Sequence, residues 1–129
     1  MNFFQKNSED SSYTQTKSFE ERLQESKSIR EKYPFRVPCI VERSHSAKKL
    51  LPKLDKFKYL VPDSLTFGQF VIIIRKRLHI SSDHALFLFA GNNVLPPVSS
   101  SMKSVYDQFA SNCGFLYITY TTESVFGKI

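Results

Sequence analysis

The residues with the clearest chemical meaning lie near the carboxyl end, in the segment Phe126-Gly127-Lys128-Ile129. Gly127 follows an alternating apolar and aromatic stretch and a short polar tail, and only two residues come after it. A glycine has no Cβ, so its backbone can enter a channel too narrow for any other residue. This position favours cleavage after Gly127, followed by activation of the new carboxylate and its transfer to an acceptor. The ordinary alternative is a frayed terminus that happens to contain a glycine.

No set of residues indicates that the chain is itself an enzyme. Its four glycines form no phosphate-cradling loop, its three histidines are scattered, and no Ser/His/Asp set has a plausible context. Cys39 and Cys113 lie far apart and show no metal-ligand spacing, which indicates reduced thiols in a cytosolic protein. We therefore expect no catalytic residue, no bound metal and no cofactor.

Length and charge restrict the remaining classes. A chain of 129 residues is one domain, large enough to bury a core. The formal charge is +6, and residues 17–62 alone hold twelve Lys and Arg against six Asp and Glu. This balance favours an acidic partner, which could be a nucleic acid, an anionic membrane or an acidic peptide. No apolar stretch approaches the ~20 residues of a membrane span, and the amino terminus lacks a signal-peptide core.

The elements that must position these residues can be read from the hydrophobic pattern. Residues 1–17 are polar and are expected to be largely disordered. A helical extension over residues 18–35, as one helix or two short ones, begins with the capping box Ser18/Glu21. A second capping box, Thr66/Gln69, opens the clearest helix. The further elements expected are strands at 37–42, 57–61, 85–90 and 115–121 and helices at 66–78 and 99–110.

This order predicts an α+β fold of the β-grasp (ubiquitin-like) type. Its four-stranded mixed sheet is crossed by the long helix at 66–78, and the helical extension precedes it. The domain is expected to cover residues 36–126, and residues 127–129 supply the conjugation glycine and the removable tail.

Several segments, in order, resemble the ubiquitin-like autophagy modifiers, the light-chain-3/GABARAP family. The resemblance covers residue 19 to the end of the chain. The segments are Lys58-Tyr-Leu-Val-Pro-Asp-Ser-Leu-Thr-Phe-Gly-Gln-Phe, Ile74-Arg-Lys-Arg, Ala85-Leu-Phe-Leu-Phe, Leu95-Pro-Pro, Gly114-Phe-Leu-Tyr-Ile-Thr-Tyr and Phe126-Gly127.

The resemblance implies a conjugation reaction at Gly127. A cysteine protease would remove Lys128 and Ile129, and activating and conjugating enzymes would then join the Gly127 carboxylate covalently to phosphatidylethanolamine. Phe87 and Phe89 match positions that the protease reads, although packing of a strand is their ordinary alternative. The protein would be cytoplasmic before conjugation and would afterwards lie on autophagosome and vacuole or lysosome membranes, where it would act in membrane expansion.

The resemblance also implies recruitment of cargo receptors through an aromatic-x-x-aliphatic motif. Residues 57–61 would form an edge strand, which the motif would extend as an added strand. The aromatic pocket would comprise Glu25, Ile29, Pro38, Ile40, Lys58, Leu60 and Phe115. The aliphatic pocket would comprise Tyr59, Val61, Pro62, Leu65, Phe70 and Ile73. Acidic residues flanking the motif would meet Arg36, Lys56, Lys58 and Arg77.

Three other interpretations stay open at this point. Most pocket positions are apolar, so core packing is their ordinary alternative, for Ile40, Leu65 and Phe70 in particular. A ubiquitin-like adaptor that binds peptides without ever being lipidated would need the edge strand but not Gly127. Nucleic-acid binding is the weakest option, because no stacking platform accompanies the basic residues.

Overall fold

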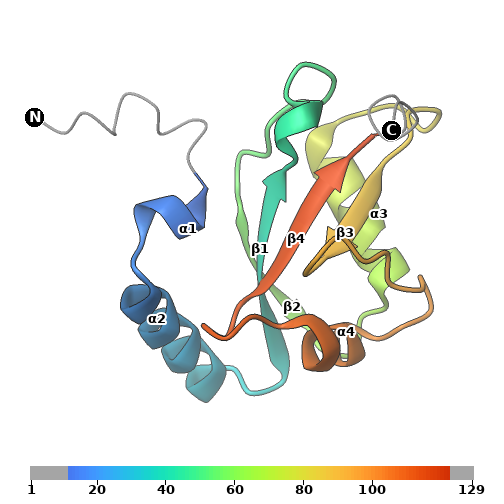
Figure 1. Cartoon of the computed structure of the whole chain (residues 1–129). Helices are drawn as coiled ribbons and strands as arrows, with labels where there is room; N and C mark the ends of the chain where they lie inside the picture. Colours follow the sequence, from blue (N-terminus) through green and yellow to red (C-terminus); the bar gives the residue numbers. More distant parts are fainter. Residues whose placement is uncertain (1–11, 123–129) are drawn as a thin grey trace, which may run out of the picture.

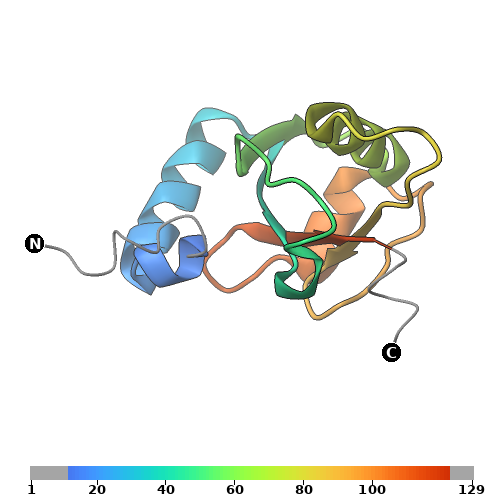
Figure 2. The ribbon, with the colours of Figure 1, turned by 90° about the horizontal axis from the view of Figure 1, so that it is seen from above.

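The structure is a computed structural model, and it describes residues 12–122. A four-stranded sheet forms its centre, with α1 and α2 together at one side of the domain and α3 at the other (Figures 1 and 2). In chain order the elements are α1 (Tyr13–Thr16), α2 (Phe19–Lys32), β1 (Arg36–Arg43), the 3₁₀ helix η2 (His45–Ala47), β2 (Lys58–Pro62), α3 (Phe67–Leu78), β3 (Phe87–Ala90), α4 (Met102–Phe109) and β4 (Leu116–Thr121).

The sheet is mixed, with the strand order β2-β1-β4-β3. β1 pairs with β2 in antiparallel fashion and with β4 in parallel fashion, and β3 runs antiparallel to β4. The two central strands are therefore β1 and β4, and β2 and β3 form the edges. This arrangement confirms the predicted α+β fold with a four-stranded mixed sheet and a long helix.

Helix α3 begins where the sequence predicts. Thr66 is the N-cap, and its side chain and that of Gln69 form the expected capping box. Four of its apolar residues, spaced at about one turn, are buried: Phe67, Phe70, Ile74 and Leu78. They pack with one face of the sheet and with α4 in the main hydrophobic core. The helix ends at His79, whose backbone is left-handed, with a φ of 56°.

A second, smaller apolar cluster joins α1 and α2 to the sheet. It contains Tyr13, Ile40, Cys113 and Phe115, with Ile29 and Tyr117 packed against it. Since Cys39 and Val41 belong to the main core, Ile40 between them points to the opposite face of β1. The sheet thus has an apolar cluster on each face near β1, and the cluster on the side of α1 and α2 is the smaller of the two.

The structure corrects the sequence-based expectation at the amino-terminal end. Residues 13–16 form α1, with Ser12 as N-cap, so the prediction of a disordered segment is wrong for residues 12–17. The following extension is one helix, not two. Its capping box at Ser18 and Glu21 is present as predicted. Residues 1–11 lie outside the described part of the chain.

Three further findings concern the described residues alone. Within residues 12–122, no helix combines the length and the apolar character that crossing a membrane requires. The same residues contain no cluster of three or more His, Cys, Asp or Glu side chains that could hold a metal ion. Cys39 and Cys113 are both buried and unpaired thiols.

Candidate functional site

The edge strand β2 presents backbone hydrogen-bonding groups to its open side. Val41 donates its N–H to the carbonyl of Phe57 at 2.8 Å, and the register pairs Cys39 with Tyr59. Bonded and non-bonded pairs alternate along an antiparallel ladder. The N–H and C=O groups of Lys58 and Leu60 therefore point away from β1, where an added strand could pair with them.

Pro38 fits this ladder. It lies opposite Leu60, at a pair that exchanges no hydrogen bonds, so its missing N–H costs the β1–β2 pairing nothing. The outward carbonyl of Leu60 accepts a hydrogen bond from Arg36 Nη1 at 3.2 Å, so Arg36 lies directly over the edge.

The residues predicted for the aromatic pocket come together on the α2 side of this edge. Lys58 Nζ and Glu25 Oε2 form an ion pair at 2.5 Å across the gap between β2 and α2. Ile40 and Phe115 are fully buried beneath it, and Ile29 packs against them. Pro38 is buried and Leu60 half-buried on the same face of the two strands. The seven positions therefore surround one location.

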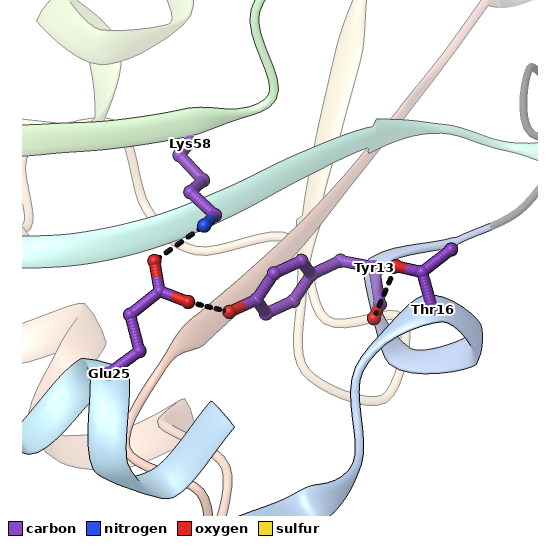
Figure 3. Close-up of polar contacts among 4 residues, drawn as sticks. All are labelled: Tyr13, Thr16, Glu25 and Lys58. Atoms are coloured by element: carbon purple, nitrogen blue, oxygen red, sulfur yellow. Dashed lines mark hydrogen bonds and ion pairs between the residues drawn. The ribbon is translucent and has the colours of Figure 1, made fainter. Parts of the chain in front are cut away.

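That location contains a side chain that the sequence analysis missed. Tyr13 of α1 is 3% exposed and lies between α2 and the sheet, with its hydroxyl donating to Glu25 (Figure 3). A signal for α1 does exist, because Ser12 and Gln15 have the S-x-x-Q spacing of a capping box, and both of its hydrogen bonds are present.

The electrostatics of this cluster keep Glu25 ionised and Tyr13 neutral. Burial pushes the pKa of Glu25 upward, but the hydrogen bonds from Lys58 and Tyr13 outweigh it and leave that pKa below its usual value. Burial raises the pKa of Tyr13, and the hydrogen bond to Glu25 adds to the rise. The tyrosine therefore remains a hydrogen-bond donor at neutral pH.

Most of the residues predicted for the aliphatic pocket lie on the α3 side of β2. Tyr59, Val61 and Phe70 belong to the main core, and the rings of Tyr59 and Phe70 meet edge to face at 6.0 Å. Leu65 is half-buried against the same core. Pro62 and Ile73 are exposed, the latter by 36%. Core packing thus accounts for the three buried residues. A ligand side chain would contact mainly the half-buried and exposed ones, Leu65, Pro62 and Ile73.

Comparison with known proteins agrees with this fold. The sequence pattern of the family described as "Autophagy protein Atg8 ubiquitin like" matches residues 21–127. Autophagy-related protein 8e of Arabidopsis thaliana is 51% identical over 109 residues, which cover 84% of this chain and 87% of that protein. The crystal structure of Trypanosoma brucei ATG8 superposes with a TM-score of 0.79 at 36% identity, covering 88% of this chain and 95% of the other. The chain belongs to the Atg8 family.

Membership in the Atg8 family confirms the resemblance and the ubiquitin-like fold. The matched segment extends to Gly127, which itself lies outside the described residues. The two phenylalanines predicted for protease recognition, Phe87 and Phe89, lie half-buried on β3, at the opposite edge of the sheet from β2. Phe87 and Phe89 share a face, while Leu88 and Ala90, which alternate with them, point into the core.

The cations predicted to meet acidic flanks lie around β2, but the structure gives each a local contact. Arg77 pairs with Asp55 at 3.1 Å, and Lys56 Nζ lies 5.3 Å from the centre of the Tyr59 ring. Arg36 bonds to Leu60, as described above. Lys58, the fourth predicted cation, pairs with Glu25. The side chains of Arg36, Lys56 and Arg77 are exposed, so their contacts can exchange for others at small cost.

Proposed function

We propose that this Atg8-family chain is a ubiquitin-like modifier that is processed after Gly127 and conjugated to phosphatidylethanolamine. On the autophagosomal membrane it acts in membrane expansion and recruits cargo receptors through aromatic-x-x-aliphatic motifs. The observation that carries the docking half is the open side of β2, with the backbone groups of Lys58 and Leu60 directed outward. The family match that extends to Gly127 supports the conjugation half.

The conjugation proceeds through acyl transfers that the partner enzymes catalyse. A protease hydrolyses the bond between Gly127 and Lys128. The activating enzyme joins the Gly127 carboxylate to AMP at the expense of ATP, releasing pyrophosphate. Its cysteine thiolate displaces AMP, and the acyl group passes to a cysteine of the conjugating enzyme. The lipid amine then attacks the thioester carbonyl, the thiolate leaves, and an amide forms.

Lipid attachment explains how one covalent bond changes the location of the protein. Each buried methylene contributes about 0.8 kcal/mol, and two acyl chains give stable anchoring where one does not. The proposal therefore places the unconjugated chain in the cytoplasm and the conjugated chain on autophagosome and vacuole or lysosome membranes.

The conjugation is tested with Gly127→Ala. The purified chain is incubated with the protease, the activating and conjugating enzymes, ATP and phosphatidylethanolamine vesicles, and its mass is measured intact. We expect the wild type to lose two residues and gain one lipid, and the Gly127→Ala variant to form at least tenfold less product. Lipidation of the variant at the wild-type rate would contradict the acceptor assignment. Absence of a lipid adduct on the wild-type chain would favour a non-lipidated adaptor.

The docking is tested by calorimetry with a short synthetic peptide that has an acidic amino-terminal flank and one Trp-x-x-Leu motif. Lys58→Ala and Leu60→Ala remove side chains from the outward pairing positions and should each weaken binding about fivefold or more, an effect of ~1 kcal/mol. Lys103→Ala, which removes an exposed cation on α4, is the matched control. Equal affinity of all four proteins would exclude β2 as the docking strand.

A further inference from the structure

Helix α1 places a tyrosine in the location predicted for the aromatic residue of a docking motif. The Tyr13 ring lies 5.5 Å from that of Phe115, edge to face, and 5.6 Å from that of Phe57. The Lys58 ammonium lies 4.8 Å from the centre of the Tyr13 ring, within the range of a cation–π contact. An aromatic side chain from a partner would need the same contacts.

Polar bonds hold Tyr13 at its hydroxyl and at its main-chain N–H, and Figure 3 shows the bond of the hydroxyl. Its hydroxyl donates to Glu25 Oε1, while Lys58 occupies the other oxygen of that carboxylate. Its main-chain N–H donates to Glu42 Oε2 at 2.7 Å. Glu25 and Lys58 were both predicted, from sequence, to contact a partner peptide. In this structure their charged groups are directed toward each other and toward α1 instead.

The rest of α1 is weakly held. The helix has four residues, and the three that follow Tyr13 are exposed. A helix this short has no stability of its own in water, so α1 depends on its contacts with the rest of the domain, which are those of Tyr13 and a hydrogen bond between Thr14 and Tyr117. The next helix, α2, carries its own capping box at Ser18 and Glu21. Release of α1 therefore leaves α2 intact, with the exposed Lys17 as the joint between them.

We propose that Tyr13 is an internal occupant of the aromatic pocket and that α1 leaves this pocket before a docking motif binds. This inference rests on the proposed docking function. The two occupants exclude each other, because both require the space between Glu25, Lys58 and Phe115. The measured dissociation constant is then the intrinsic constant divided by the fraction of molecules in which α1 is released.

The affinity test uses the acidic Trp-x-x-Leu peptide and four full-length proteins. Tyr13→Ala removes the occupant and should bind about tenfold more tightly than the wild type. Tyr13→Phe keeps the ring but loses the bond to Glu25, so its affinity should lie between the two. Tyr33→Ala, which removes a tyrosine that is 39% exposed at the end of α2, should bind as the wild type does.

The outcomes separate this inference from the proposed function. If the wild type and Tyr13→Ala bind the peptide equally, Tyr13 does not compete and the inference is overturned, while docking stands. If neither binds, both the docking function and the inference are overturned, since removal of the occupant should have opened the pocket.

A second measurement reports on α1 in the unaltered chain. The amides of Thr16 and Lys17 donate to the carbonyls of Ser12 and Tyr13 in α1. Saturation with the peptide should increase their rate of hydrogen exchange at least fivefold and make the chain more sensitive to trypsin after Lys17. Bound peptide with unchanged exchange at these two amides would show that α1 stays in place, and would overturn the inference.

Discussion

Gly114 lies shortly before β4 in the chain and packs directly against α2. Its φ of +93° lies in a backbone region that residues other than glycine rarely adopt. Ser26 of α2 lies directly against it and donates its hydroxyl to the carbonyl of Cys113. A Cβ on Gly114 would fall well inside the contact distance of Ser26 Oγ. This residue therefore sets how closely α2 approaches Phe115, and so the width of the aromatic side of the site.

We expect Gly114→Ala to lower the free energy of unfolding by about 2–4 kcal/mol, the sum of left-handed strain and a steric clash. Gly91→Ala is the matched control, because Gly91 also has a positive φ, of 57°, but has room for a Cβ. It should cost about 1–2 kcal/mol. Urea denaturation measures both. A Gly114→Ala variant no less stable than Gly91→Ala would contradict the role of Ser26.

At the scale of elements, the segment between η2 and β2 is held by one side chain of β4 and one of β1. Tyr120 is fully buried, and its hydroxyl accepts the N–H of Leu54 at 3.0 Å and donates to the carbonyl of Pro52 at 2.8 Å. Arg43 Nη1 donates to the carbonyl of Leu51 at 2.8 Å. Because this segment leads directly into β2, its anchoring positions the edge strand that we propose for docking.

Tyr120→Phe keeps the ring but leaves the Leu54 N–H and the Pro52 carbonyl without this partner. We expect it to lower the free energy of unfolding by about 1–3 kcal/mol, the cost of unsatisfied buried polar groups. Trypsin should also cleave after Lys53 faster than in the wild type. Tyr33→Phe, at an exposed tyrosine, is the control. Unchanged stability and cleavage in Tyr120→Phe would show that the segment is held elsewhere.

The elements also show what the sequence could predict. Long periodic segments, such as α3 with its cap at Thr66, carry enough local information to be recognised. Alternation along a strand is equally local, and in β2 it puts Lys58 on the α2 side and Tyr59 in the core. Helix α1 was missed because four residues give no periodicity, and because Tyr13 is held by partners remote in sequence, Glu25 and Lys58 among them. The structure also assigns to packing several residues that a pocket was predicted to use, with Phe70 fully buried.

At the scale of the whole molecule, the charge of +6 acts on every acidic partner. Exposed cations around β2 exert a field that attracts an acidic flank before any specific contact forms, and this raises the association rate. Salt screens such a field over roughly 8 Å at physiological ionic strength. The affinity for the proposed acidic motif should therefore depend on salt concentration. This dependence should be stronger than for a motif that makes the pocket contacts alone.

We expect the affinity for the acidic Trp-x-x-Leu peptide to fall by about three- to tenfold between 0.05 and 0.5 M NaCl, mostly through a slower association rate. A peptide with the same motif and an uncharged flank is the control and should lose less than twofold. Stopped-flow fluorescence of the peptide tryptophan measures the rates, since the chain itself has no Trp. Equal salt dependence of the two peptides would show that the flank meets no cations.

The parallel pairing of β1 with β4 has a consequence for synthesis on the ribosome. β1 is the first strand and β4 the last of the four, yet they lie side by side in the middle of the sheet. A nascent chain that has not yet exposed residues 116–121 holds a β1–β2 hairpin and a β3 that lacks the strand it pairs with. The sheet therefore cannot be completed until almost the whole domain has been synthesised. Until then, the edges of β1 and β3 that β4 will cover remain unpaired and accessible to chaperones.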